Sequence, residues 1–264
     1  GLDRFNSATD RINRFRPDPD NPSIIIPDSI NCIIEVNDGN LLIGSSKGLY
    51  LFDSKHQRFS HIYYKKSIYS KSVNAFLEDR FSRNVYIGTD NKMLVFNKDK
   101  HVLTDDDRIN RLIPTIGSIN SFCKSGNDLI WIGHSMGLTK LDLQSNSVWH
   151  YQVITSSFYN ELNYFHQLIE DDNGFLWLIA GSGENGSLMI FDSRSEKFKR
   201  IENDPDNPLS ISSTKNIFSI CKDRTGIIWV GTLLNGLNKW DSNRNRFKRT
   251  TQDFNKAVNR DLGR

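Results

Sequence analysis

The chain has 264 residues, a formal net charge of +3 and 37% hydrophobic residues. This length and apolar content allow one globular unit with a sizeable core, and the nearly balanced charge gives no reason to expect nucleic-acid binding by this chain. We expect no membrane contact by it either, because it contains no uninterrupted apolar span of membrane length.

The first residues resemble the second half of a unit that recurs later. Gly1–Asn6 repeats the pattern of Gly48–Asp53 at a constant offset of 47 residues, which predicts a half blade over residues 1–16. The two strands that would precede this half blade are missing from the sequence. Either the chain is part of a larger ring, or strands from another chain or region complete the broken blade.

Five complete copies of the unit follow, each anchored on a short apolar run. The run ends in Gly44, Gly88, Gly133, Ile179 or Gly231, and these anchors are 44, 45, 46 and 52 residues apart. A four-stranded unit that repeats every ~40–50 residues is typical of a propeller blade. The sequence therefore predicts an all-β fold, a β-propeller of about five whole four-stranded antiparallel blades plus an N-terminal half blade.

Each copy predicts four short strands. One apolar strand precedes the anchor, a second ends at it, and a third ends in an aromatic residue or leucine ahead of a fourth apolar position. Gly39, Gly174 and Gly226 lie between the first two strands, where glycine supplies the positive φ of a tight hairpin. No segment has a sustained period of 3.6, so helix should be scarce. The predicted blades are 30–62, 72–103, 116–151, 162–200 and 214–249, with 1–249 as one propeller domain and 250–264 as a tail or the start of a following segment.

The repeat also accounts for residues that could otherwise suggest chemistry. Cys32, Cys123 and Cys221 occupy the first strand of three different blades, so we predict small core residues and no disulfides. Three tryptophans at one position of the second strand resemble a sugar-stacking platform, but their shared place predicts packing between blades. These are Trp131, Trp177 and Trp229.

No motif indicates catalysis, a metal or a cofactor. The six histidines are scattered, and none has the spacing of a zinc site. The acidic stretch 104–108 lacks the alternating ligands of a calcium loop and is typical of a solvated loop. The glycine-rich stretch 181–186 lacks the lysine and helix of a phosphate cradle. We therefore predict that this chain is not an enzyme, although sequence alone does not test paired carboxylates for glycoside cleavage.

Candidate binding residues lie where the copies differ. Propellers usually bind with the loops between the second and third strands, and polar variety within a repeated frame is what a ligand surface would show. The alternative is an ordinary set of variable surface loops. Trp149 and His150 also break the pattern, at the edge of a fourth strand. The candidates for a ligand or partner surface are Lys47, Asp90, His134, Glu184, Asn235, Trp149 and His150.

The fifth copy resembles the two-component regulator propeller repeat. Residues Ile217–Asp241 follow the pattern I-x-x-I-x-x-D-x-x-G-x-I-W-V-G-T, with G-L-x-x-W-D after it, and Asp204–Ser213 precedes them as D-P-D-N-P-L-S-I-S-S. The resemblance extends from Gly1 to about Arg249 and is weakest in the second copy, where Lys92 and Met93 replace Gly-Leu.

This resemblance implies the periplasmic sensor region of a hybrid two-component system of the kind found in gut Bacteroidetes. It implies a glycan-derived oligosaccharide as ligand, a neighbouring propeller or immunoglobulin-like domain, a dimer in the full-length sensor, and a histidine kinase outside this chain. Two other interpretations stay open. One is a propeller scaffold that binds a protein and senses nothing, and the other is a propeller lyase or glycosidase.

Overall fold

The computed structural model describes residues 1–15, 29–36, 39–65, 67–68, 71–79, 82–112, 116–153, 163–181, 186–241 and 246–249. The predicted tail, 250–264, lies outside these ranges. The chain divides into two compact units, Gly1–Asn120 and Ser121–Arg264. Helix is scarce, as predicted: α1 (Asp107–Asn110) has four residues.

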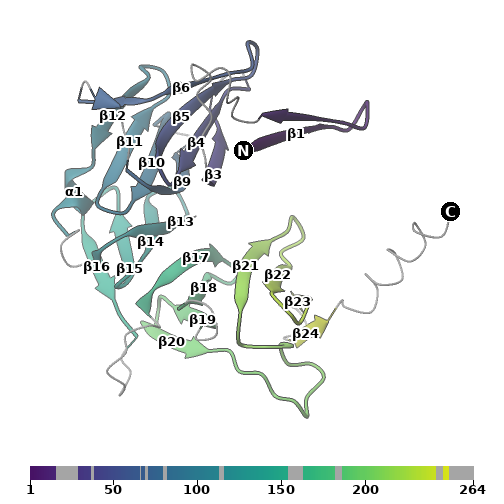
Figure 1. Cartoon of the computed structure of the whole chain (residues 1–264). Coiled ribbons are helices and arrows are strands. Elements are labelled where there is room, and N and C mark those ends of the chain that lie inside the picture. The colour runs from purple at the N-terminus through teal and green to yellow at the C-terminus, as the bar shows by residue number, and fades with distance from the viewer. Residues whose placement is uncertain are drawn as a thin grey trace. The chain divides into compact units, whose positions relative to one another are not determined.

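Unit 1 contains a two-stranded hairpin and two four-stranded sheets (Figure 1). The hairpin consists of β1 (Leu2–Asn6) and β2 (Arg11–Phe15). The first sheet consists of β3 (Ile30–Glu35), β4 (Leu41–Ser45), β5 (Gly48–Asp53) and β6 (Arg58–His61). The second consists of β9 (Val73–Asp79), β10 (Asn84–Thr89), β11 (Met93–Asn97) and β12 (Val102–Asp105). A small extra hairpin, β7 (Tyr63–Tyr64) and β8 (Ser67–Ile68), joins the two sheets and is absent from the predicted repeat.

The other three four-stranded sheets follow in chain order. The third consists of β13 (Ile119–Ser125), β14 (Leu129–His134), β15 (Gly137–Asp142) and β16 (Val148–Tyr151). The fourth consists of β17 (Phe165–Glu170), β18 (Phe175–Ala180), β19 (Ser187–Asp192) and β20 (Lys197–Arg200). The fifth consists of β21 (Ile217–Lys222), β22 (Ile228–Thr232), β23 (Leu237–Asp241) and β24 (Arg246–Arg249). In all five sheets each strand pairs with its neighbours in sequence. Each sheet is therefore one blade, and the predicted count of five blades and a half blade is confirmed.

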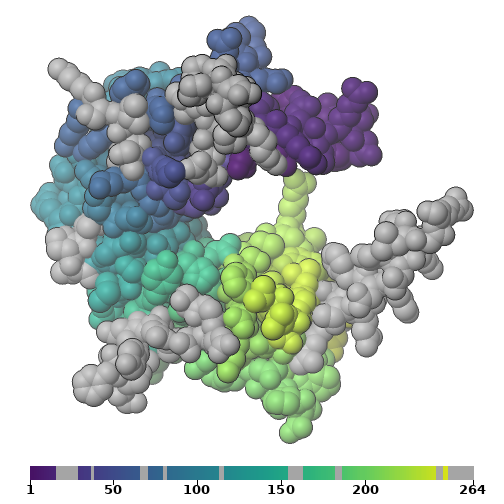
Figure 2. Space-filling model, viewed as in Figure 1, coloured from purple at the N-terminus to yellow at the C-terminus, as the bar shows by residue number. Residues whose placement is uncertain are grey.

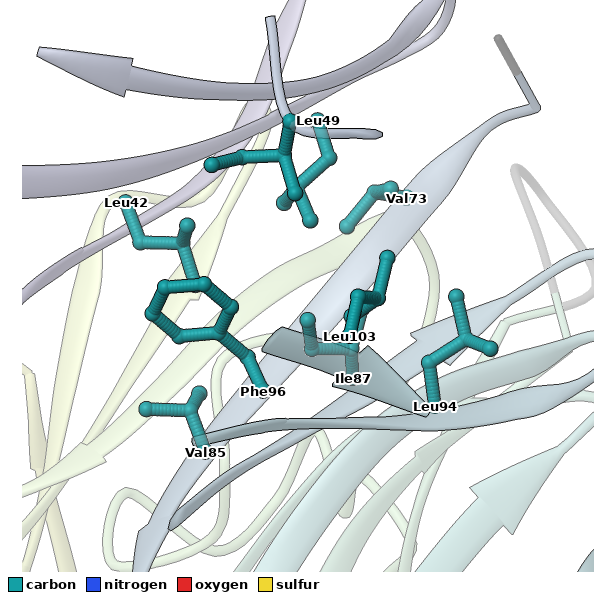
Figure 3. Packing of buried hydrophobic residues seen from close by; sticks show 9 residues of the cluster. Leu42, Leu49, Val73, Val85, Ile87, Leu94, Phe96 and Leu103 are labelled. Carbon is teal, nitrogen blue, oxygen red and sulfur yellow. The ribbon is translucent and has the colours of Figure 1, made fainter. Parts of the chain in front are cut away.

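Within each unit, neighbouring blades pack face to face through apolar side chains. In unit 1, Leu42 and Leu49 of the first blade meet Val85, Leu94 and Phe96 of the second, all at most 1% exposed (Figure 3). Because strand residues alternate between faces, the apolar side chains that meet form one row on the facing side of each of the two blades. This packing makes the repeated apolar positions of the sequence the core of the fold.

The second-strand tryptophans take part in this packing. Trp131 lies with its ring centroid 5.6 Å from that of Phe191 in the next blade, and Trp177 lies 5.3 Å from Trp240. Their exposed fractions are 2% and 1%, so the predicted core role is confirmed for both. Trp229 is only partly buried, because no further sheet of the described residues follows the fifth blade.

The anchor glycine is required by close approach of neighbouring chain segments. A Cβ atom on Gly44 would lie 2.5 Å from both Cys32 Sγ and Val73 Cγ1, which is far inside contact distance. The fourth copy has Ile179 at this place, and Ile179 pairs with Leu188 as Gly44 pairs with Leu49. The predicted register of that copy is therefore right.

The half blade packs against the first complete blade. The ring of Phe15 lies 5.0 Å from that of Phe52 and 6.0 Å from that of Phe59. Phe5 and Ile12, which match Phe52 and Phe59 in the repeat, are 59% and 54% exposed. Figure 2 shows much of the surface of this hairpin, in purple, uncovered.

Two predictions are wrong, one about Cys221 and one about the acidic stretch 104–108. Cys221 is exposed and is not a core residue, because it shares the uncovered face of the fifth blade with Trp229. Cys32 and Cys123 are partly buried free thiols, and burial raises the pKa of each to about 12. The acidic stretch is not a solvated loop, since Asp105 ends β12 and the buried Asp106 caps α1 by accepting the Arg108 N–H.

Candidate functional site

In the first, second and fifth blades, the loop between the second and third strands contains a turn built by the hydroxyl of the residue after the anchor. In the first blade the Ser45 hydroxyl donates to the Gly48 carbonyl (3.2 Å) and accepts the Lys47 N–H (3.1 Å). Thr89 and Thr232 make the same pair of bonds in the second and fifth blades. The turn holds the loop backbone in place, so the next residues project from a fixed support.

Three of the predicted loop residues lie exposed on this support. Lys47 and Asp90 are exposed in unit 1, where the Asp90 carboxylate accepts a hydrogen bond of 2.9 Å from Asn74 Nδ2. Asn235 is exposed in unit 2, and its carbonyl accepts from Ser212 Oγ at 3.1 Å. Glu184 lies outside the described residues. Their role as a ligand surface stays a prediction.

His134 takes the place of the turn hydroxyl in the third blade and is fully buried. Its Nδ1 accepts the Met136 N–H at 3.2 Å, as Ser45 accepts the Lys47 N–H. Its Nε2 lies 2.9 Å from Thr139 Oγ1. His134 therefore shapes the loop, and it acts on a ligand only through the residues that it holds.

His134 and Thr139 both contact His150 and fix its position. The two imidazole rings are stacked, with centroids 5.1 Å apart and planes at 19°, and Thr139 Oγ1 lies 3.3 Å from His150 Nδ1. Because His134 Nδ1 accepts a backbone N–H, its proton is on Nε2, which donates to Thr139, and the Thr139 hydroxyl donates onward to His150 Nδ1. Burial lowers the pKa of His150. The chain of bonds thus leaves the Nε2–H of a neutral His150 as a donor.

Trp149 belongs to a different place from His150. Adjacent strand residues point to opposite faces, so β16 separates the two side chains. Trp149 is 42% exposed, and the Lys140 ammonium lies 5.0 Å from its ring and 5.8 Å from that of Trp131. These cation–π contacts fix the orientation of the Trp149 ring at the blade surface. The structure brings His134 and His150 together and leaves Trp149 apart.

The sequence did not reveal a polar cluster in unit 1. Asp105 accepts from the Tyr64 hydroxyl (2.5 Å) and forms ion pairs with Lys65 (2.9 Å) and Lys92 (3.2 Å). Burial alone would raise the pKa of Asp105, but the hydrogen bonds from Tyr64, Lys65 and Lys92 lower it to about 2. Lys92 lies in the loop between β10 and β11, the same kind of loop as Lys47. Tyr64 and Lys65 come from the extra hairpin, which no repeat position could predict.

Neither unit shows a metal centre in its described residues. There, no group of three or more His, Cys, Asp or Glu side chains is arranged to hold a metal ion. No helix within the described part of the chain has the length and apolarity needed to cross a bilayer. What the geometry offers is exposed polar side chains on fixed turns, an arrangement suited to binding.

The blades define the class of the protein as a β-propeller of four-stranded blades. Residues 210–233, which span β21 and β22, match the family model described as two component regulator propeller. The chain thus carries the repeat of that family, and the resemblance predicted from the fifth copy is confirmed. No curated protein matches the sequence.

Solved structures confirm the fold. The extracellular domain of the hybrid two component system BT3049 from B. thetaiotaomicron matches with a TM-score of 0.69 and 19% identity, over 93% of this chain and 32% of that one. The corresponding domain of BT4673 matches with a TM-score of 0.65 and 20% identity, over 85% and 28%. Virginiamycin B lyase from Staphylococcus aureus matches with a TM-score of 0.62 and 12% identity, over 93% and 75%. The chain therefore spans about a third of the length of the two extracellular domains that it resembles.

Proposed function

We propose that the chain is a sensor propeller of a hybrid two-component regulator and lies on the extracytoplasmic, periplasmic side of the membrane. The observation that carries the proposal is the match of residues 210–233 to the two component regulator propeller model. The fold shared with the extracellular domains of BT3049 and BT4673 supports it. In this proposal the chain has no catalytic role, and a histidine kinase elsewhere in the protein produces the output.

The ligand in this proposal is a glycan-derived oligosaccharide that binds the loops between second and third strands. Sugar hydroxyls are recognised by fixed donors and acceptors, and His150, held by Thr139 and His134, offers such a donor. A rigid blade cannot pass on a signal by itself. The ligand must bind more tightly to one docking arrangement of two protomers or neighbouring domains than to another.

An apolar loop tip supplies a contact for such docking. Leu233 and Leu234, in the loop between β22 and β23 beside Asn235, are 60% and 80% exposed. Water-exposed leucines next to each other at the end of a fixed turn favour a protein contact. We propose a neighbouring propeller or immunoglobulin-like domain, or a second protomer, as the partner. The exposure of these two leucines also favours the second candidate function, a scaffold that binds a protein and senses no ligand.

Isothermal titration of this chain against a panel of oligosaccharides tests the proposal. We expect saturable heat with at least one member, lost in His150→Ala and retained in His56→Ala, because His56 lies in another blade, between β5 and β6, and pairs with Asp53. No heat with any member would favour the scaffold. Chromatographic detection of a shortened or unsaturated product would instead indicate a lyase or glycosidase, the activity class suggested by the fold shared with virginiamycin B lyase.

A further inference from the structure

A pocket of about 230 Å³ opens between the fourth and fifth blades, away from the loops considered above. Its walls are mainly apolar and aromatic: Phe175 and Trp177 of β18, Ile190 of β19 and Trp240 of β23. Lys199 of β20 lies at its edge and is exposed. The pocket is smaller than the ~300–1,000 Å³ of sites for drug-sized molecules, so it suits a ligand built on a single ring.

Two substitutions within the repeat account for the lining. In the fourth blade Trp177 pairs across the strands with Ile190, and Ile190 with Lys199. The same three positions of the third blade hold Trp131, Lys140 and Trp149. There the long Lys140 side chain lies between two rings, with its ammonium 5.8 Å from that of Trp131 and 5.0 Å from that of Trp149. The smaller Ile190 and the flexible Lys199 leave the wall beside Trp177 open.

The lining holds one carboxylate, Asp171, and one ammonium group, Lys199, and of these two Lys199 is the one that can meet a ligand. The Asp171 carboxylate in the lining is already satisfied, because it accepts the N–H groups of Asn173 and Phe175 (2.9 Å each) and the Trp177 indole N–H (3.0 Å). Lys199 forms no ion pair with any residue in the described ranges, so its ammonium is the available charge. An apolar ring wall with one available cation at its edge is complementary to an aromatic ring bearing one carboxylate.

We propose that this pocket binds a small planar aromatic carboxylate, whose ring packs on Phe175, Ile190 and Trp240 and whose carboxylate faces the Lys199 ammonium. Binding there would press against both the fourth and the fifth blade and so stabilise their contact. The inference does not rest on the proposed oligosaccharide sensing, because it uses neither the same loops nor the same ligand chemistry.

Benzoate and its neutral analogue benzamide are the probes, observed by NMR of the tryptophan indole N–H groups in the complete chain. We expect a saturable shift of the Trp240 and Trp177 signals, with benzoate binding about threefold more tightly than benzamide, as an exposed ion pair supplies. Lys199→Gln should reduce benzoate to the affinity of benzamide, and Lys199→Arg should keep the preference.

The control variant carries the third-blade residues at two positions of the fourth blade. Ile190→Lys combined with Lys199→Trp should abolish binding of both probes while leaving the far-ultraviolet circular dichroism unchanged. The proposal is overturned if the indole signals show no saturable shift in the wild-type chain. It is also overturned if Lys199→Gln leaves the ratio of the two affinities unchanged.

Discussion

In the fourth and fifth blades, one aspartate forms hydrogen bonds both to the turn of the first hairpin and to the second-strand tryptophan. Asp171 and Asp223 each accept two backbone N–H groups of the turn and the indole N–H of the second-strand tryptophan six residues later. This explains why the repeat carries both Asp and Trp. The carboxylate satisfies donors that the turn would otherwise leave without partners.

Removing this acceptor should therefore destabilise the protein. In Asp171→Ala the indole N–H of the buried Trp177 loses its acceptor, and we expect a loss of ~1–3 kcal/mol in the free energy of unfolding. Chemical denaturation followed by tryptophan fluorescence measures it. The matched control is Asp172→Ala, which removes an exposed ion pair with Lys222 and should cost ~0–1 kcal/mol. Equal losses in the two variants would contradict this role of Asp171.

The lowered pKa of His150 predicts a pH dependence of stability. Because burial holds its pKa below that of the unfolded chain, the unfolded state takes up a proton first as the pH falls. Stability is complete above the unfolded value of about 6.5 and decreases as the pH drops below it. We expect His150→Gln to flatten the decrease in thermal midpoint between pH 7 and pH 5. His61 and His166, whose pKa values burial also lowers, should keep part of the slope. Identical slopes for variant and wild type would refute the assignment.

At the scale of elements, local sequence determined most of the fold. Anchor spacing and turn glycines predicted the five blades, and Trp131 and Trp177 are buried as predicted. The stacking of His134 on His150 and the pairing of Tyr64 with Asp105 were not predictable. These contacts join residues 16 and 41 positions apart, and they depend on cross-strand register and on an inserted hairpin that no repeat position specifies.

The packing of the N-terminal hairpin on the first complete blade can be tested by two substitutions. Phe15 packs on Phe52 and Phe59, whereas Phe5 on the same hairpin is 59% exposed. Phe15→Ala should lower the free energy of unfolding by ~1–3 kcal/mol, less than for a fully buried phenylalanine. Phe5→Ala, the matched control, should change it by less than ~0.5 kcal/mol. Urea denaturation compares them, and a larger loss for Phe5→Ala would show that the hairpin packs by its other face.

For the molecule as a whole, the proposed function makes signalling depend on how the propeller docks on its partner. Leu234→Asp places a charge on the exposed loop tip of the fifth blade. In the receptor that we propose for this propeller, we expect the variant to change basal kinase output while ligand affinity stays within about twofold of wild type. Leu209→Asp is the control, because Leu209 is also exposed (46%) but lies outside that loop. Equal effects of the two variants would remove the loop tip from the docking surface.

We propose that ligand binding to this propeller changes the output of a kinase. The most direct measurement is autophosphorylation of the receptor in membranes, with and without an oligosaccharide that binds the isolated chain. We predict a ligand-dependent change in phosphorylation that His150→Ala abolishes and His56→Ala preserves. An oligosaccharide that saturates the propeller and leaves phosphorylation unchanged would contradict it.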